Sequence, residues 1–263
     1  MNELQKRIIT AVVLLLFSIV WMFCLPEPLF TYVTALIGFL MTLEMLRLLG
    51  LRPVWPYIAI AAIVFGLLAS HMALAHMFVL CMALWMLPFL FSGQSTENLK
   101  FSYQIMLASH WMMLWLVLFV WMLLQLHQQA NGIAFLCGAF LGVWASDIGA
   151  YFTGKKWGRR KLCAAVSPGK SWEGFAGGLI AGVGIAASFW VFTIHMDWYV
   201  ALFLSMVLVV TGVVGDLLES ALKRSVDAKD SGISLPGHGG ALDRLDSLIT
   251  AVPVTGLLWM AVQ

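Results

Sequence analysis

Long apolar runs, each close to the length of a membrane-spanning helix, constrain this chain more than any other feature. About 20 apolar residues cross the hydrocarbon core of a bilayer, and tilt allows shorter or longer spans. Only helices and closed barrels satisfy their backbone hydrogen bonds there, and barrel strands read as short alternating segments. The unbroken runs therefore predict an all-α polytopic membrane protein with about nine transmembrane helices. The predicted spans are residues 8–24, 28–46, 54–69, 73–91, 103–126, 133–152, 175–194, 198–217 and 245–262.

Composition excludes a water-soluble globular domain. Hydrophobic residues make up 62% of the chain and charged residues only 11%, whereas soluble domains carry about a quarter charged residues. So few charges cannot cover a surface that faces water. The first apolar run follows Lys6 and Arg7 as a signal peptide would, but it lacks a small-residue cleavage site and equal runs follow it. We therefore interpret this run as a span.

Basic residues predict how the chain lies across the membrane. With these spans, all 15 Lys and Arg residues fall before the first span or in the loops after even-numbered spans. Cytoplasmic loops carry such an excess of Lys and Arg. The sequence thus predicts a cytoplasmic N-terminus and an external C-terminus.

Polarity divides the chain near residue 130. Residues 1–130 carry few polar groups and are predicted to form N-terminal transmembrane helices. Residues 131–263 carry almost all of the polar motifs, in two predicted cytoplasmic loops at about 153–174 and 217–245 and in the flanking helix ends. We expect this second part to be the catalytic region.

The densest polar motif covers residues 215–224. Its polar side chains recur at i, i+3, i+4 and i+7, so on a helix they form one stripe. An acidic side chain in or near hydrocarbon is costly, which makes it a functional candidate by default. The stripe consists of Asp216, Glu219, Ser220 and Lys223.

A second acidic pair opens the last predicted span. Asp243 and Asp246 are three residues apart and follow the glycine-rich segment 237–240. Glycine lets backbone N–H groups approach an anion, and a helix N-terminus favours phosphate. Carboxylates suit Mg²⁺, which usually keeps substrate phosphates among its ligands, and nearby Lys and Arg would neutralise phosphate charge. The two motifs predict a site for a metal ion and a phosphorylated substrate.

Two weaker motifs precede these. In residues 146–151, Asp147 lies within an apolar run and needs a cation or a Lys side chain as a partner. Residues 167–174 contain a Gly-Lys-Ser sequence, but the phosphate-loop spacing GxxxxGK[ST] is missing and no strand is expected before it. This last motif gains meaning only from its neighbours.

Together these motifs resemble the phosphatidate cytidylyltransferases, also called CDP-diacylglycerol synthases. The resemblance is carried by residues 220–246, which read S-x-L-K-R-x4-K-D-x-G-x2-L-P-x-H-G-G-x2-D-R-L-D. Segments 146–151 and 167–174 also resemble family motifs, in the family order. Ala241 departs from the pattern, because the family usually has a larger aliphatic residue there. The C-terminal half resembles the family closely, and the N-terminal half only as apolar spans.

The resemblance implies an enzyme of phospholipid biosynthesis that converts CTP and phosphatidic acid to CDP-diacylglycerol and pyrophosphate. It implies Mg²⁺, with room for a second cation such as K⁺, and many members are dimers, so a homodimer is expected. We expect a bacterial cytoplasmic (inner) membrane protein whose active site faces the cytoplasm. Nucleic acid is not an expected partner.

The resemblance also implies roles for individual residues. The expected metal ligands are Asp216, Asp243, Glu219 and Asp246. Lys223 and Arg244 complete the expected catalytic set. The expected substrate-binding residues are Ser167, Lys170, Ser171, Ser220, Arg224, Lys229, His238, Gly239, Gly240 and Asp147.

Two alternatives stay open at this point. One is a CTP-dependent cytidylyltransferase that acts on another lipid phosphate, such as an isoprenoid phosphate. The other is an ion-coupled membrane transporter, because intramembrane carboxylates also mark ion paths. A transporter would place its charges near the bilayer midplane, whereas nearly all charges here lie on one side. Glu44, three residues before Arg47, is interpreted as half of a local ion pair.

Overall fold

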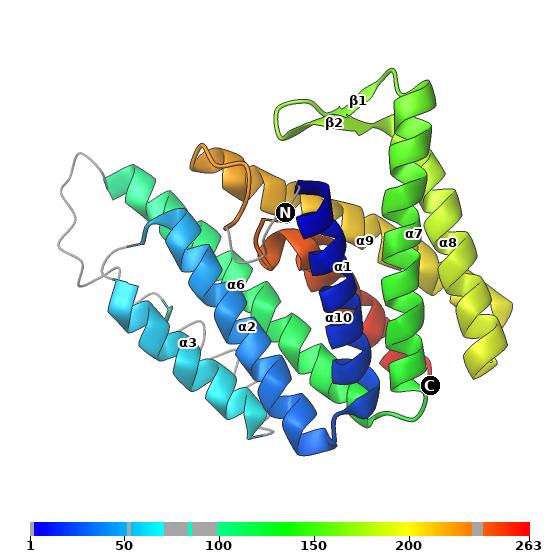
Figure 1. Cartoon of the computed structure of the whole chain (residues 1–263), viewed down its shortest axis with the longest axis horizontal. Coiled ribbons are helices and arrows are strands. Elements are labelled where there is room, and N and C mark those ends of the chain that lie inside the picture. Colours follow the sequence, from blue (N-terminus) through cyan, green and yellow to red (C-terminus); the bar gives the residue numbers. More distant parts are fainter. Residues whose placement is uncertain (1–2, 52–53, 71–83, 86–98, 233–238) are drawn as a thin grey trace. The chain divides into compact units, whose positions relative to one another are not determined.

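The computed structural model describes residues 3–51, 54–70, 84–85, 99–232 and 239–263 (Figure 1). This part of the chain is helical apart from one short hairpin, which confirms the predicted all-α class. The helices are α1 (Glu3–Ile19), its π-helical continuation η1 (Val20–Cys24), α2 (Glu27–Leu49), α3 (Val54–Ala69), α6 (Leu99–Gln128), α7 (Gly132–Trp157), α8 (Trp172–Ile194), α9 (Trp198–Ser225) and α10 (Leu242–Ala261).

Several helices are long and apolar enough to cross a bilayer. These are α2, residues Tyr103–Gln128 of α6, and α7, α8 and α9. Residues Val12–Cys24 and α3 form shorter apolar helices. The predicted span 73–91 lies outside the described residues, except for positions 84 and 85, which are helical. The chain is therefore a multi-pass membrane protein, and the total of nine spans stays a prediction.

The chain folds into two compact units. Unit 1 contains Met1–Leu124 and Val226–Arg244, and unit 2 contains Gln125–Ser225 and Leu245–Gln263. The motif at 215–246 is therefore shared, since its first part and its last residues belong to unit 2 and its middle to unit 1. The division that we predicted near residue 130 follows the distribution of polar motifs and stays a prediction.

Unit 1 is organised around α2. The Trp21 ring stacks on Phe30 at 5.4 Å between ring centroids, and its indole N–H donates to Thr34 Oγ1 at 3.0 Å. A Cβ at Gly38 would overlap Phe65 of α3 and Val120 of α6. Because glycine stands there, three helices pack closely around the middle of α2.

Small residues also let α7 and α8 approach closely within unit 2. The two helices lie side by side (Figure 1). A Cβ at Gly142 would overlap Ala186, and a Cβ at Gly182 would overlap the Gly142 carbonyl oxygen. Such glycine contacts are typical of helix pairs in membranes. Farther along, Trp190 Nε1 donates to the Phe135 carbonyl at 3.0 Å, and the two rings stack.

A hairpin joins α7 to α8. Strands β1 (Lys161–Cys163) and β2 (Ser167–Ser171) pair antiparallel, with Lys161 opposite Ser171. The sequence analysis expected a loop here and no strand before the Gly-Lys-Ser motif. That expectation is wrong, because the motif is itself a strand and pairs with a preceding one. Ser171 keeps an extended backbone (φ −129°, ψ 158°) as the N-cap of α8, so strand and helix meet without an intervening turn.

Gly182→Ala should lower the thermal unfolding temperature of the detergent-solubilised protein. The new methyl group would overlap the Gly142 carbonyl and the Val209 side chain, and such overpacking costs about 1–3 kcal/mol. Gly184→Ala, in the same helix, is the matched control because nothing lies within 4 Å of its added Cβ. Alanine also has the higher helix propensity, so the control should lose nothing. Equal losses in the two variants would contradict this packing.

Candidate active site

Unit 2 gathers four carboxylates near the hairpin. Asp147 belongs to α7, Asp216 and Glu219 belong to α9, and Asp246 belongs to α10. Asp246 experiences the negative charges of the other three. Asp147 experiences the negative charge of Asp216 and the positive charge of Lys170. We call these four side chains the acidic cluster. Because like charges repel strongly away from bulk water, such a cluster needs cations close by.

Lys170 brings a positive charge from the hairpin to the acidic cluster. Its Nζ forms an ion pair with Asp216 Oδ2, and Ser220 Oγ donates to Asp216 Oδ1 at 3.3 Å. The Lys170 and Asp216 side chains remain 27% and 23% exposed, so the pair can be reached by a ligand. The sequence analysis expected a cation or a Lys side chain as the partner of Asp147. Lys170 does attract Asp147, but its ion pair is with Asp216.

The predicted polar stripe on α9 is confirmed. Glu219 and Lys223 are buried one helical turn apart, with 2.7 Å between Glu219 Oε2 and Lys223 Nζ. Ser220 and Asp216 form the second i, i+4 contact of the stripe. On α10, the Ser247 N–H donates to Asp246 Oδ1 at 2.6 Å. Two lysines thus lie beside the acidic cluster, and each is paired with one of its carboxylates.

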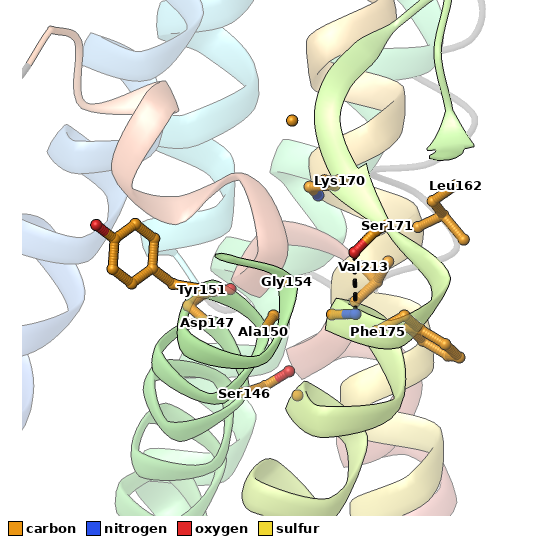
Figure 2. A pocket seen from close by; sticks show the side chains of 13 residues that line it. Ser146, Asp147, Ala150, Tyr151, Gly154, Leu162, Lys170, Ser171, Phe175 and Val213 are labelled. Atoms are coloured by element: carbon orange, nitrogen blue, oxygen red, sulfur yellow. Dashed lines mark hydrogen bonds between the residues drawn. The ribbon is translucent and has the colours of Figure 1, made fainter. Parts of the chain in front are cut away.

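A cavity of about 240 Å³ lies beside the Lys170 ion pair. Figure 2 shows its lining, to which α7 contributes Ser146 and Asp147 and the hairpin contributes Leu162, Lys170 and Ser171. Most of the remaining lining is apolar. A cavity with mainly apolar walls and a few charged groups is typical of small-molecule sites, and this one is large enough for part of a ligand.

Ser171 also has a structural role. Its Oγ accepts a hydrogen bond from Gly174 N at 3.1 Å and so caps the N-terminus of α8. The neighbouring Glu173 accepts from the backbone N–H groups of Arg159 (3.0 Å) and Arg160 (3.2 Å). Residues 167–174 therefore hold together the hairpin, the segment 159–160 that precedes it and the start of α8.

Asp243 is held by three hydrogen bonds within unit 1. Its Oδ2 accepts from Ser231 N at 2.9 Å, from Ser231 Oγ at 3.0 Å and from Gly240 N at 2.8 Å. Gly239 has a φ of +79°, a conformation that favours glycine, and an added Cβ would also overlap Asp243 Oδ2. The glycine pair therefore permits the backbone at Gly239 and Gly240 to approach this carboxylate closely.

The structure divides the predicted site residues between the two units. Arg224, Lys229 and Arg244 are exposed, and Ser167 lies opposite Cys163 in the hairpin. His238 lies outside the described residues. Unit 1 contains Lys229, Gly239, Gly240, Asp243 and Arg244, and unit 2 contains Asp147, Ser167, Lys170, Ser171, Asp216, Glu219, Ser220, Lys223, Arg224 and Asp246.

The donor set fits Mg²⁺ held jointly with a substrate. Carboxylate oxygens are the hard ligands that Mg²⁺ prefers, and one or two of them suffice when substrate phosphates and water complete the shell. In the described ranges, no three His, Cys, Asp or Glu side chains gather closely enough to hold a metal alone. The residues therefore suit an ion that arrives with a phosphorylated ligand.

Comparison with known proteins identifies the family. The sequence model of the cytidylyltransferase family matches residues 5–262. This chain belongs to the cytidylyltransferase family. It is 38% identical to a phosphatidate cytidylyltransferase of Pseudomonas aeruginosa over 98% of both chains. Shorter matches are 48% identical to the Haemophilus influenzae phosphatidate cytidylyltransferase and 46% identical to the Bacillus subtilis one. Each of these covers 46% of the relative, so the chain matches about half the length of those two proteins.

Family membership confirms the predicted enzyme class, a nucleotidyltransferase that uses CTP. It favours this class over the transporter considered above. The sequence analysis interpreted the buried acid Glu44 only as half of a local ion pair with Arg47 and did not place it at the site of this cytidylyltransferase. Glu44 on α2 accepts a hydrogen bond from Leu242 N at 2.8 Å, and the rule that flags acids inside apolar spans could have singled it out.

Ser171→Ala should destabilise this cytidylyltransferase by about 1 kcal/mol, because α8 loses its N-cap. The measurement is the free energy of unfolding in detergent, taken from a denaturant titration. Ser225→Ala is the matched control, since that hydroxyl donates to the Leu222 carbonyl at the exposed end of α9. The control should change by less than about 0.5 kcal/mol. A fully stable Ser171→Ala protein would mean that the cap contributes nothing.

Proposed function

We propose that the chain synthesises CDP-diacylglycerol by transferring the cytidylyl group of CTP to phosphatidate, with release of pyrophosphate. The observation that carries the proposal is the 38% identity to the P. aeruginosa phosphatidate cytidylyltransferase over 98% of both chains. The acidic cluster with its two lysines supports it, because phosphoryl transfer depends on groups that position and neutralise phosphates.

The reaction needs little covalent help from the protein. A phosphate oxygen of phosphatidate attacks the α-phosphorus of CTP, a new P–O bond forms, and the bond to the β-phosphate oxygen breaks. The nucleophile is already an anion at neutral pH, so no strong general base is required. Positioning and charge neutralisation then supply most of the rate acceleration.

Lys170 is the residue that we place at the phosphates of CTP. Its ammonium group neutralises Asp216 in the ligand-free protein and lies on the wall of the cavity. A triphosphate offers this lysine a more highly charged partner than one carboxylate does. Moving from Asp216 to phosphate would let Lys170 follow the negative charge as it builds on the leaving pyrophosphate.

Four carboxylates are the candidates for holding Mg²⁺. Asp216 and Asp243 are the first candidates. Glu219 and Asp246, each three residues farther along the chain, are the second. When bound, the ion would neutralise phosphate charge and polarise the α-phosphorus. Asp243 is oriented by three hydrogen bonds, and such support is typical of ligating carboxylates. A second cation such as K⁺ is part of this proposal.

The membrane arrangement completes the proposal. We place nine spans in a bacterial cytoplasmic (inner) membrane, with a cytoplasmic N-terminus, an external C-terminus and the active site on the cytoplasmic side. The distribution of the 15 Lys and Arg residues supports this orientation. Residues 131–263 form the catalytic region in this arrangement, and a homodimer is the expected assembly.

Asp216→Asn and Asp243→Asn should each lower CDP-lipid and pyrophosphate formation by more than about 100-fold while the protein stays folded. The assay supplies purified protein with CTP, Mg²⁺ and phosphatidic acid. Asp197→Asn is the matched control, because this exposed acid contacts Tyr199 and lies outside both acidic motifs. Near-normal turnover in both site variants would reject the metal assignment. CTP binding without reaction would favour another lipid phosphate as acceptor, which isoprenoid phosphates would test.

Lys170→Met should lower kcat/KM for CTP by about 10- to 100-fold, the range expected when a hydrogen bond to a charged group is lost. Lys161→Met on the partner strand of the hairpin is the control, since that lysine is exposed and takes no part in the ion pair. Steady-state kinetics with varied CTP measures both variants. Equal kinetics for the two would remove Lys170 from the phosphate site.

A further inference from the structure

Glu44 connects α2 of unit 1 to Ser231 and to the start of α10, where Asp243 lies. It lies in α2, is only 5% exposed, and its Oε2 accepts from Leu242 N at 2.8 Å. The same oxygen lies 3.3 Å from Ser231 Oγ. A buried carboxylate is costly unless it is hydrogen-bonded, and these contacts cross 198 and 187 residues of sequence. The Glu44 side chain therefore binds both Ser231 and Leu242.

The contact with Leu242 caps the N-terminus of α10. The residue before that helix is Ala241, whose side chain has no oxygen to accept the first free N–H groups. Helices usually take this acceptor from a Ser, Thr, Asp or Asn at the N-cap. Here Glu44 supplies it from a different helix, and its negative charge also suits the positive end of the helix dipole.

Ser231 links Glu44 to Asp243. Its single hydroxyl proton is shared between Asp243 Oδ2 at 3.0 Å and Glu44 Oε2 at 3.3 Å. The backbone N–H of Ser231 donates to Asp243 Oδ2 as well. A change at Glu44 therefore reaches Asp243 by two routes, through the shared serine and through the start of α10.

Two glycines of the motif fit against the Glu44 carboxylate. A Cβ at Gly232 or at Gly240 would overlap its Oε1, and the one at Gly240 would also overlap Ser231 Oγ. These positions accept no side chain while Glu44 occupies its place. The packing thus explains why glycine stands at positions 232 and 240.

We propose that Glu44 is a positioning residue of the cytidylyl transfer, whose carboxylate holds Ser231 and the start of α10 so that the Asp243 carboxylate keeps one orientation. The catalytic consequence rests on the function proposed above. The hydrogen bonds themselves can be tested without substrate or metal. The two parts of the proposal therefore have separate readouts.

The first readout is amide hydrogen exchange of the ligand-free, detergent-solubilised protein, followed in peptides that cover residues 226–245. Glu44→Leu should speed exchange of the Ser231, Gly240 and Leu242 amides by about 10-fold or more, because their acceptors are lost or released. Glu44→Gln keeps an oxygen that can accept from Leu242 and should restore most of the protection. Thr42→Val is the matched control, because Thr42 is buried in the same helix and contacts Gly38 and Met113 instead.

The second readout is steady-state kinetics. Glu44→Leu should lower kcat by about 10-fold or more, Glu44→Gln should stay within about 3-fold of the wild-type rate, and Thr42→Val should not change kcat. A purely structural role would give Glu44→Gln and Glu44→Leu the same loss. Unchanged exchange in Glu44→Leu would overturn the proposal, and so would faster exchange with an unchanged kcat.

Gly240→Ala provides a second variant in case Glu44→Leu does not fold. Its methyl group would displace the same carboxylate from the other side, so exchange of the Ser231 and Leu242 amides should rise. Gly66→Ala on α3 is its control, since nothing lies within 4 Å of that added Cβ. Protection equal to that of the wild type in Gly240→Ala would overturn the proposal. A wild-type protein that forms no CDP-lipid would reject the proposed function instead, and the exchange results would still decide the contacts.

Discussion

A charged side chain inside an apolar helical protein must find a partner. This constraint organises the acidic cluster of unit 2 and the polar side chains around Asp243 in unit 1. Removing an isolated charge from water costs far more than one hydrogen bond returns. Each of the buried or half-buried acids described above accordingly has a partner. Asp216 has Lys170 and Ser220, Glu219 has Lys223, and Asp243 has a set of N–H and O–H donors. The helices can be so apolar because their few charges neutralise one another.

The same pairing prepares the site for a phosphorylated substrate. An ion pair between a lysine and a carboxylate holds both groups in place without a ligand, and in the proposed reaction a triphosphate with a cation would supply each with a new partner. In such an exchange of partners the lysine would gain a phosphate and the carboxylate would gain a cation. Substrate binding would then leave neither side chain with an unpaired charge. Positioned groups that need little rearrangement are the main source of rate acceleration in phosphoryl transfer.

Local patterns in the sequence predicted much of this structure. The i, i+4 spacing on α9 placed Ser220 on Asp216 and Lys223 on Glu219, because residues one turn apart share a helix face. The apolar runs placed helices because only helical backbone suits long apolar segments in lipid. The hairpin was missed because Ser167–Ser171 has no alternating apolar pattern. The role of Glu44 was missed because its partners lie almost 200 residues away, and no local spacing encodes such a contact.

That separation has a consequence for how the protein is made. Chains grow at about 5–20 residues per second, so α2 leaves the ribosome roughly 10 to 40 seconds before Ser231 and Leu242 do. During that interval Glu44 cannot form either contact, although the helix around it is ready to enter the bilayer. A side chain that reaches the membrane surface would keep the carboxylate in contact with water during this period. Position 44 of α2 is therefore compatible with two environments, the unfinished chain in the membrane and the completed fold.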